Sequence, residues 1–268
     1  MRGLVAVEDV ERTVTPRYLP IGRTQTRVRP PVVRPERVPL ERLDVVGLSA
    51  RYASGAGVRD ASLTIGRGEF VVLTGPIGSG KTTLLRALLG LAWQTEDAGE
   101  VRWNGRLLDD RAAFLVPPNA GFLPQVPQLV SDSLAENIAF GEATDDQVRR
   151  SLEVAMLSDD VGGFSDGLDT VVGPRGLRLS GGQRQRLAAA RAIVHLPELV
   201  VLDDVSSALD VETELRLWAS LADAGMTVLA VSHRAVAFER ADRVYRLDSG
   251  VVSVVGSGVA GACGPVRP

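Results

Sequence analysis

Short apolar runs alternate with longer amphipathic segments along most of the chain. Phe70–Thr74, Leu199–Asp203 and Thr227–Ser232 are largely apolar over the length of a strand, which predicts buried strands. Between them, Lys81–Leu91 and Gln183–Val194 carry apolar residues at helical spacing. Strands that alternate with helices predict an α/β fold with a parallel sheet.

Two further regions show different patterns. Val45–Tyr52 and Ala61–Ile65 flank a glycine-rich stretch at 54–57, which predicts an antiparallel hairpin ahead of the sheet. The stretch from about 132 to 196 is mostly helical in pattern, including Asp145–Leu157, and predicts a helical region inserted into the core. Arg243–Leu247 predicts a last strand.

The first 42 residues contain nine arginines and six prolines, and proline at this density blocks helices and central strands. We therefore expect an extended arm or linker at 1–42 and a folded domain at 43–250, with its helical part at about 126–190. Residues 251–268 are expected to form a tail of small residues. The positive charge of the arm leaves two interpretations open, contact with an anionic surface and a solvated tether, and we favour the tether.

Composition narrows the class of protein. A hydrophobic content of 45% and a charged content of 24% are typical of a globular protein, and a net charge of −3 gives no reason to expect a nucleic acid partner. No apolar run is long enough to span a membrane, and the first residues lack an apolar signal-peptide core, so we expect a soluble chain. The single cysteine, Cys263, suits a reducing compartment.

The most specific motif runs from Gly75 to Thr82, between a predicted strand and a predicted helix. Its lysine, Lys81, is the only lysine among 30 basic residues, and a slim ammonium can curl over a phosphate chain as a point charge. The spacing G-x-x-x-x-G-K-T predicts a loop that binds a nucleoside triphosphate, with Lys81 on the terminal phosphates and the Thr82 hydroxyl on Mg²⁺. The nucleotide-binding residues expected here are Gly75, Pro76, Ile77, Gly78, Ser79, Gly80, Lys81, Thr82 and Thr83.

Two other motifs extend this site. The apolar strand that starts at Leu199 ends in Asp203 and Asp204, and Asp203 beside the phosphate loop is expected to provide a second anchor for Mg²⁺. Ser180-Gly181-Gly182-Gln183 opens a helical segment, which predicts a second helix N-terminus suited to phosphate. Two phosphate-binding ends in one chain are more than one nucleotide needs.

These motifs, in this order, strongly resemble the ATP-binding cassette (ABC) family over about residues 43–250. The resemblance implies a P-loop NTPase core with an N-terminal antiparallel β-subdomain and a helical signature subdomain. It also implies that two domains sandwich ATP·Mg²⁺ head to tail, so that the phosphate loop of one faces Ser180 of the other. The roles implied for other residues are stacking on adenine for Tyr52, contact with Mg²⁺ and water for Gln125, communication across the dimer for Asp210, and contact with the γ-phosphate for His233.

The stretches 133–141 and 172–176 resemble the exporter type, although Pro174 stands where that type frequently has glutamate. The implied function is an ATP-hydrolysing subunit of an ABC transporter at the cytoplasmic face of the plasma membrane. Its implied partners are a membrane-spanning permease domain or subunit and a second ABC ATPase domain. The arm is then either the remainder of a connector to a membrane domain or the tether of a separate subunit.

Asp204 departs from the family, where a glutamate at this place is the expected general base. Its side chain is shorter by one carbon–carbon bond, about 1.5 Å. Either the backbone or a bridging water closes this gap and hydrolysis continues, or the site is slow and favours bound ATP; we favour a working ATPase. A non-transport ABC protein or such a nucleotide-gated switch is the alternative. A kinase would not explain Ser180-Gly181-Gly182-Gln183.

Overall fold

A computed structural model describes residues 34–92, 96–140, 143–173, 178–205 and 208–257. The strands are β1 (Arg42–Arg51), β2 (Gly57–Gly66), β3 (Phe70–Thr74), β4 (Glu96–Trp103), β5 (Arg106–Leu107), β6 (Ala120–Leu123), β7 (Leu199–Leu202), β8 (Thr227–Val231), β9 (Arg243–Asp248) and β10 (Val251–Ser257). The helices are α1 (Lys81–Leu88), α2 (Arg111–Phe114), α3 (Leu134–Ala139), α4 (Asp145–Val154), α5 (Ser158–Gly163), a 3-10 turn at Gly167–Asp169, α6 (Gly181–Ile193), α7 (Val211–Asp223) and α8 (Ala235–Arg240).

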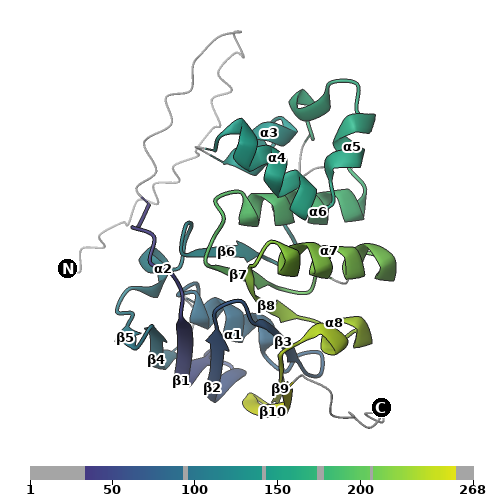
Figure 1. Cartoon of the computed structure of the whole chain (residues 1–268). Coiled ribbons are helices and arrows are strands. Elements are labelled where there is room, and N and C mark those ends of the chain that lie inside the picture. The colour runs from purple at the N-terminus through teal and green to yellow at the C-terminus, as the bar shows by residue number, and fades with distance from the viewer. Residues whose placement is uncertain (1–33, 93–95, 141–142, 174–177, 206–207, 258–268) are drawn as a thin grey trace, which may run out of the picture. The chain divides into compact units, whose positions relative to one another are not determined.

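The larger sheet is mixed, with the strand order β10-β9-β3-β8-β7-β6 (Figure 1). All of its neighbouring pairs are parallel except β9 and β10, which are antiparallel. Every residue of β7 and β8 is buried, as is typical of parallel strands covered on both faces. Because the carboxyl ends of parallel strands meet at one edge, the segments that follow β3, β6, β7 and β8 gather there, and these segments carry most of the predicted site residues.

The smaller sheet is antiparallel and has the order β2-β1-β4-β5. The predicted hairpin of β1 and β2 is present, but each strand is longer than expected, and β4 and β5 join it from beyond α1. Its inner face shares one apolar cluster with β3 and α1, which includes Leu43, Leu63, Val71 and Leu85. The α/β architecture is therefore confirmed, but the larger sheet is mixed rather than purely parallel, because β10 pairs antiparallel with β9.

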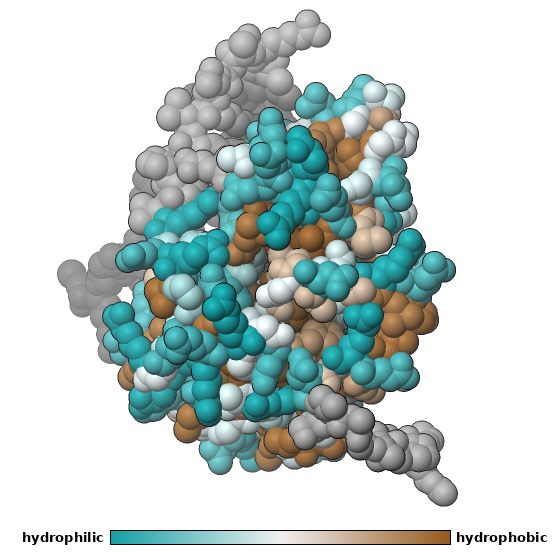
Figure 2. Space-filling view, in the orientation of Figure 1, coloured by the Kyte–Doolittle hydropathy of each residue, from teal (hydrophilic) through white to brown (hydrophobic). Residues whose placement is uncertain are grey.

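The helices α3, α4 and α5 lie together at one end of this unit, next to α6 (Figure 1). Their apolar faces form a second cluster with β7, β8 and α7, to which Leu134, Leu152, Leu187 and Trp218 contribute. On the face that Figure 2 shows, hydrophilic residues predominate, and smaller hydrophobic areas lie between them. In the part of the chain that the structure describes, no helix is long and apolar enough to cross a bilayer.

Several element ends differ from the expectations. The helix predicted at 81–91 ends at Leu88, because Gly90 adopts φ +71° and the amides of Gly90 and Leu91 donate to the carbonyls of Ala87 and Arg86 in a Schellman turn. The helix predicted at 145–157 ends at Val154 in the same way. The helix expected from 183 begins two residues earlier, at Gly181.

Both expected flanks also contain ordered structure. The tail expected from residue 251 begins with β10, which pairs with β9 as far as Ser257. Within the expected arm, residues 34–41 run along the core: Leu40 is fully buried, and Arg37 forms an ion pair with Glu198 at 2.8 Å. The backbone of Val38 donates to Asn119 and accepts from the indole of Trp103. This segment therefore contacts both sheets.

Candidate functional site

The phosphate-loop motif lies between β3 and α1, as predicted. A Cβ on Gly75 would lie 1.9 Å from the carbonyl oxygen of Leu247 on β9, so only glycine fits where the loop leaves the sheet. Gly80 has φ +103° and is the N-cap residue of α1, where the backbone N–H groups at the helix start are available to an anion. Ile77 is almost fully exposed, whereas Ser79 is buried.

Lys81 bends back over this loop. Its Nζ donates to the carbonyls of Gly75 at 2.7 Å and Pro76 at 2.8 Å. Burial lowers the pKa of Lys81, and the nearby carboxylates of Asp204 and Asp203 partly oppose that shift. The ammonium is therefore held above the loop by neutral acceptors, in reach of a ligand that carries negative charge.

Asp203 follows β7 and lies against the start of α1. Its side chain is almost fully buried, and burial raises the pKa of Asp203, while a hydrogen bond with Thr82 lowers it. Mg²⁺ in nucleotide sites prefers one or two such oxygen ligands together with phosphates and water. A hydroxyl beside a poorly solvated carboxylate fits this preference, because a cation would replace the hydration that burial removes from Asp203.

Asp204 occupies an unusual backbone conformation. Its φ of +52° lies in the left-handed region, which residues other than glycine rarely adopt. Its Oδ2 accepts a hydrogen bond from Nε2 of Gln125 at 3.1 Å, so the segment after β6 and the segment after β7 are joined at this point. The two residues therefore meet, as the implied roles require, although the contact itself could not be read from the sequence.

His233 follows β8 and is exposed to solvent on one side. Burial lowers the pKa of His233 from its ordinary value of 6.5, Lys81 lowers it further, and Asp204 opposes the shift. The next residue, Arg234, donates through Nη1 to Oε2 of the fully buried Glu214 at 2.7 Å. Sequence reasoning missed this ion pair, although a glutamate on an otherwise apolar face of α7 was a usable signal.

One cavity of about 450 Å³ collects most of the predicted residues. It is lined by Ile77, Gly78, Gly80, Lys81, Thr82, Thr83, Gln125, Asp203, Asp204 and His233. The segments that follow four parallel strands therefore deliver a cation, two carboxylates, an amide, two hydroxyls and an imidazole to one space.

Ser180 begins α6 outside the lining of this cavity. Its Oγ accepts from the amide of Gln183 at 3.1 Å, and Oε1 of Gln183 accepts from the amide of Ser180 at 2.8 Å, which makes a capping box. Gln183 also donates to Asp160, so its side chain serves the local fold. Gly181 and Gly182 lie in the first turn, and Gly181 lines a separate cavity with Gln125.

The remaining predicted residues lie around the site. Tyr52 is half-buried in the turn between β1 and β2, and it does not line the main cavity. Asp210 caps α7 by accepting from the amide and hydroxyl of Thr213, and these hydrogen bonds lower the pKa of Asp210. Pro174 and Cys263 lie outside the described residues.

Comparison with known proteins places this site in a family. The model of the family described as "ABC transporter" matches residues 58–207. An ATP-dependent lipid A-core flippase of Burkholderia pseudomallei (strain 1710b) is 41% identical over 201 residues, which are 74% of this chain and 33% of the flippase. A flippase of the same name from Dechloromonas aromatica (strain RCB) is 39% identical over 260 residues, which are 93% of this chain and 42% of the flippase.

A solved structure gives the same result at the level of the fold. A bacterial Atm1-family ABC exporter with ATP bound superposes with a TM-score of 0.73 at 26% sequence identity, over 86% of this chain and 40% of the exporter chain. The present chain thus spans less than half of the length of these relatives. From the family match and these similarities, the chain belongs to the ABC transporter family, and the matched region is its ATPase domain.

Proposed function

We propose that this chain hydrolyses ATP as a subunit of an ABC exporter, paired with a second ABC ATPase domain and with a membrane-spanning partner at the cytoplasmic face of the plasma membrane. One observation carries the proposal: a single cavity holds Lys81, Thr82 and Asp203 together with Asp204 and His233. Ser180 does not line that cavity. A second domain would therefore have to present its own Ser180 to the nucleotide.

In this proposal the loop residues bind and orient the nucleotide. Lys81 offsets the phosphate charge, and its ammonium is already oriented by the carbonyls of Gly75 and Pro76. Thr82 and Asp203 would hold Mg²⁺, which supplies neutralisation of the β- and γ-phosphate charge when bound. Backbone N–H groups at the start of α1 would bind phosphate oxygens without a cost for reorganisation.

Asp204 is the proposed general base. Gln125 donates to Oδ2 of Asp204, which fixes the direction of the carboxylate that would accept a proton from the attacking water. His233 is expected to be neutral near pH 7, because its pKa is lowered, and a neutral imidazole can donate to a γ-phosphate oxygen from one ring nitrogen.

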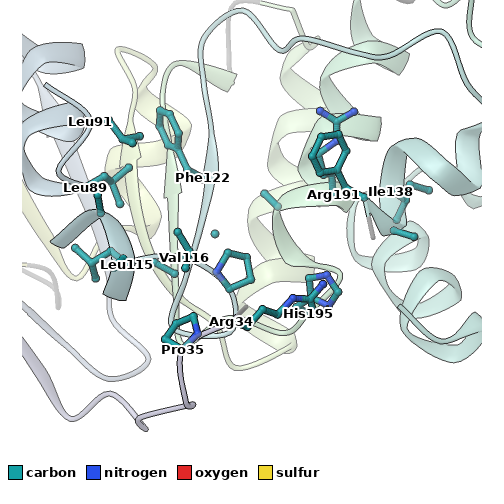
Figure 3. A pocket seen from close by; sticks show the side chains of 18 residues that line it. Arg34, Pro35, Leu89, Leu91, Leu115, Val116, Phe122, Ile138, Arg191 and His195 are labelled. Atoms are coloured by element: carbon teal, nitrogen blue, oxygen red, sulfur yellow. Dashed lines mark hydrogen bonds between the residues drawn. The ribbon is translucent and has the colours of Figure 1, made fainter. Parts of the chain in front are cut away.

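A groove of about 750 Å³ supports the proposed membrane partner. Figure 3 shows Leu89, Leu91 and Leu115 on one side of it, with Ile138 and Arg191 on the other. The described residues of its lining are mostly apolar and include basic side chains but no acidic one. Such a surface suits the apolar face of a short helix from a partner.

The proposal is tested by steady-state ATP hydrolysis of the purified chain over a wide range of protein concentration. If two domains complete each site, the rate per molecule rises with concentration and then levels off. Lys81→Met should abolish the rate at every concentration. A rate per molecule that stays constant over the whole range would count against the dimer.

A nucleotide-gated switch with slow hydrolysis is the second candidate, because Asp204 is one methylene shorter than glutamate. Asp204→Glu and Asp204→Asn separate the two. In a working ATPase Asp204→Asn loses turnover, while in a slow switch Asp204→Glu gains turnover strongly and Asp204→Asn changes little.

A further inference from the structure

Arg191 lines the groove of Figure 3 and belongs to α6, the helix that Ser180 caps. It is in the last turn of α6, and Ser180 caps the first turn of the same helix. At about 1.5 Å of rise per residue, the ten steps from Gly181 to Arg191 span about 15 Å. A single rigid element therefore connects the groove wall to the Ser180 end.

The guanidinium of Arg191 binds the segment that follows Gln125. Nη1 donates to the carbonyl of Gln128 at 2.7 Å, Nε donates to the carbonyl of Asn137 at 2.6 Å, and Nη2 donates to Oδ1 of Asn137 at 2.7 Å. Gln128 is three residues beyond Gln125, so at most about 10 Å of chain separates them. A shift of the Arg191 head would therefore act on the backbone that holds Gln125.

Asn137 makes this segment a single unit. It is fully buried, its Oδ1 also accepts from the amide of Val130, and its Nδ2 donates to the carbonyls of Val130, Asp132 and Ser133. The loop is thus wrapped around one side chain of α3. Because Arg191 donates to two oxygens of Asn137, it ties this loop and α3 to α6.

Arg191 is partly buried among uncharged groups, which costs free energy for a charged side chain. Its guanidinium donates to two carbonyls and a side-chain amide, and its Cζ lies 5.2 Å from the ring centroid of Phe140. Burial lowers the pKa of Arg191. Phe140 has φ +36°, a left-handed conformation that is strained for an aromatic residue, and its ring is more than half exposed in the groove.

We propose that Arg191 is a positioning residue that holds the Ser180 end of α6 and the Gln125 loop in one relative arrangement. This inference rests on the proposed function, because it assigns Arg191 a role in that reaction rather than a new reaction.

The first test compares rate with binding. Arg191→Lys keeps the charge but loses the planar fork of donors. We expect kcat for ATP to fall at least about tenfold, since misplacing a reacting group by 1 Å can cost about a hundredfold. The dissociation constant for ATP at low protein concentration, where the Lys81 loop dominates, should stay within about twofold. Arg216→Lys is the control, because Arg216 is exposed on α7, a helix as long as α6.

The second test asks whether Arg191 acts through Gln125. In a double-mutant cycle with Gln125→Ala, the double variant should lose less than the product of the two single losses. Losses that multiply, an unchanged kcat for Arg191→Lys, or parallel losses of kcat, ATP affinity and melting temperature would overturn the inference. If Arg191→Lys does not fold, Phe140→Leu is taken through the same cycle.

Amide hydrogen exchange decides the question without hydrolysis. Arg191→Lys should speed exchange across 125–133 and leave 75–83 unchanged, whereas equal exchange in variant and wild type would overturn the inference. A wild-type chain that does not hydrolyse ATP would refute the proposed function alone, and the exchange result would still decide on Arg191.

Discussion

Arg234→Met tests how much the ion pair between Arg234 and the buried carboxylate of Glu214 stabilises the fold around the loop that carries His233. Glu214 lies in the first half of α7 and is fully buried, and its Oε2 accepts from Arg234 at 2.7 Å. Its Oε1 accepts from the indole of Trp218 at 3.1 Å. Arg234 follows His233 directly, so the ion pair joins the helix after Asp210 to the loop at the cavity.

The expected cost follows from this burial. Removing one partner of a buried ion pair costs about 3–5 kcal/mol, because a charge remains in a poorly solvated place. The side chain of Arg234 is 32% exposed, so water can reach the remaining carboxylate once Arg234 is shortened. We therefore expect the lower end, about 3 kcal/mol of unfolding free energy. Removing both charges in Glu214→Met with Arg234→Met should cost less than Arg234→Met alone.

Urea unfolding, followed by far-UV circular dichroism, measures these differences as shifts in midpoint at a shared slope. Arg216→Met, an exposed change on α7, is the control and should stay within about 0.5 kcal/mol of wild type. The reasoning fails if Arg234→Met behaves like this control, or if the double variant is destabilised by the full sum of the two single changes.

Three further predictions concern other parts of the chain. Gly75→Ala should lose ATP binding and lower the melting temperature, because its Cβ would lie 1.9 Å from the Leu247 carbonyl oxygen; a variant with wild-type affinity would contradict this geometry. Proton NMR of a His195→Gln background, which removes the other histidine of the chain, should find His233 titrating below pH 6.5. Lys81→Met should raise the pKa of His233, since burial and Lys81 both lower that pKa. The free energy of unfolding should then increase as the pH rises through 6.5, because the unfolded chain binds more protons at His233 than the folded chain does in that range. Glu198→Ala, which removes one of the acceptors of Arg37 and the acceptor of the Leu40 amide, should speed tryptic cleavage after Arg37, and an unchanged rate would show that residues 34–41 are held by other contacts.

The parts of the fold that the sequence could predict are those governed by local signals. The end of α1 was predicted three residues too late, although Gly90 is a local signal for the left-handed residue of its Schellman turn. The end of α4 has the same hydrogen bonds, but the left-handed residue is Met156, which carries no such signal. Strand β4 was missed since its charges and Gly99 mask any alternation, and pairing with β1 decides its structure.

The candidate site was predictable to a similar degree. Motifs at the ends of predicted parallel strands must converge, so the shared cavity of Lys81, Asp203 and His233 follows from topology. The contacts that orient these residues did not follow, because they depend on which distant side chains meet. The hydrogen bond from Gln125 to Asp204 and the ion pair between Arg234 and Glu214 are of this kind.

The geometry around Lys81 explains why one lysine remains in a chain that otherwise uses arginine. Two carbonyls of the loop, those of Gly75 and Pro76, converge on a single nitrogen at 2.7 and 2.8 Å. A guanidinium spreads its donors over a planar fork and cannot present one compact charge to two acceptors that point at the same atom. The loop is thus shaped around a point charge, and the third N–H of the Lys81 ammonium can donate to a phosphate oxygen above the loop.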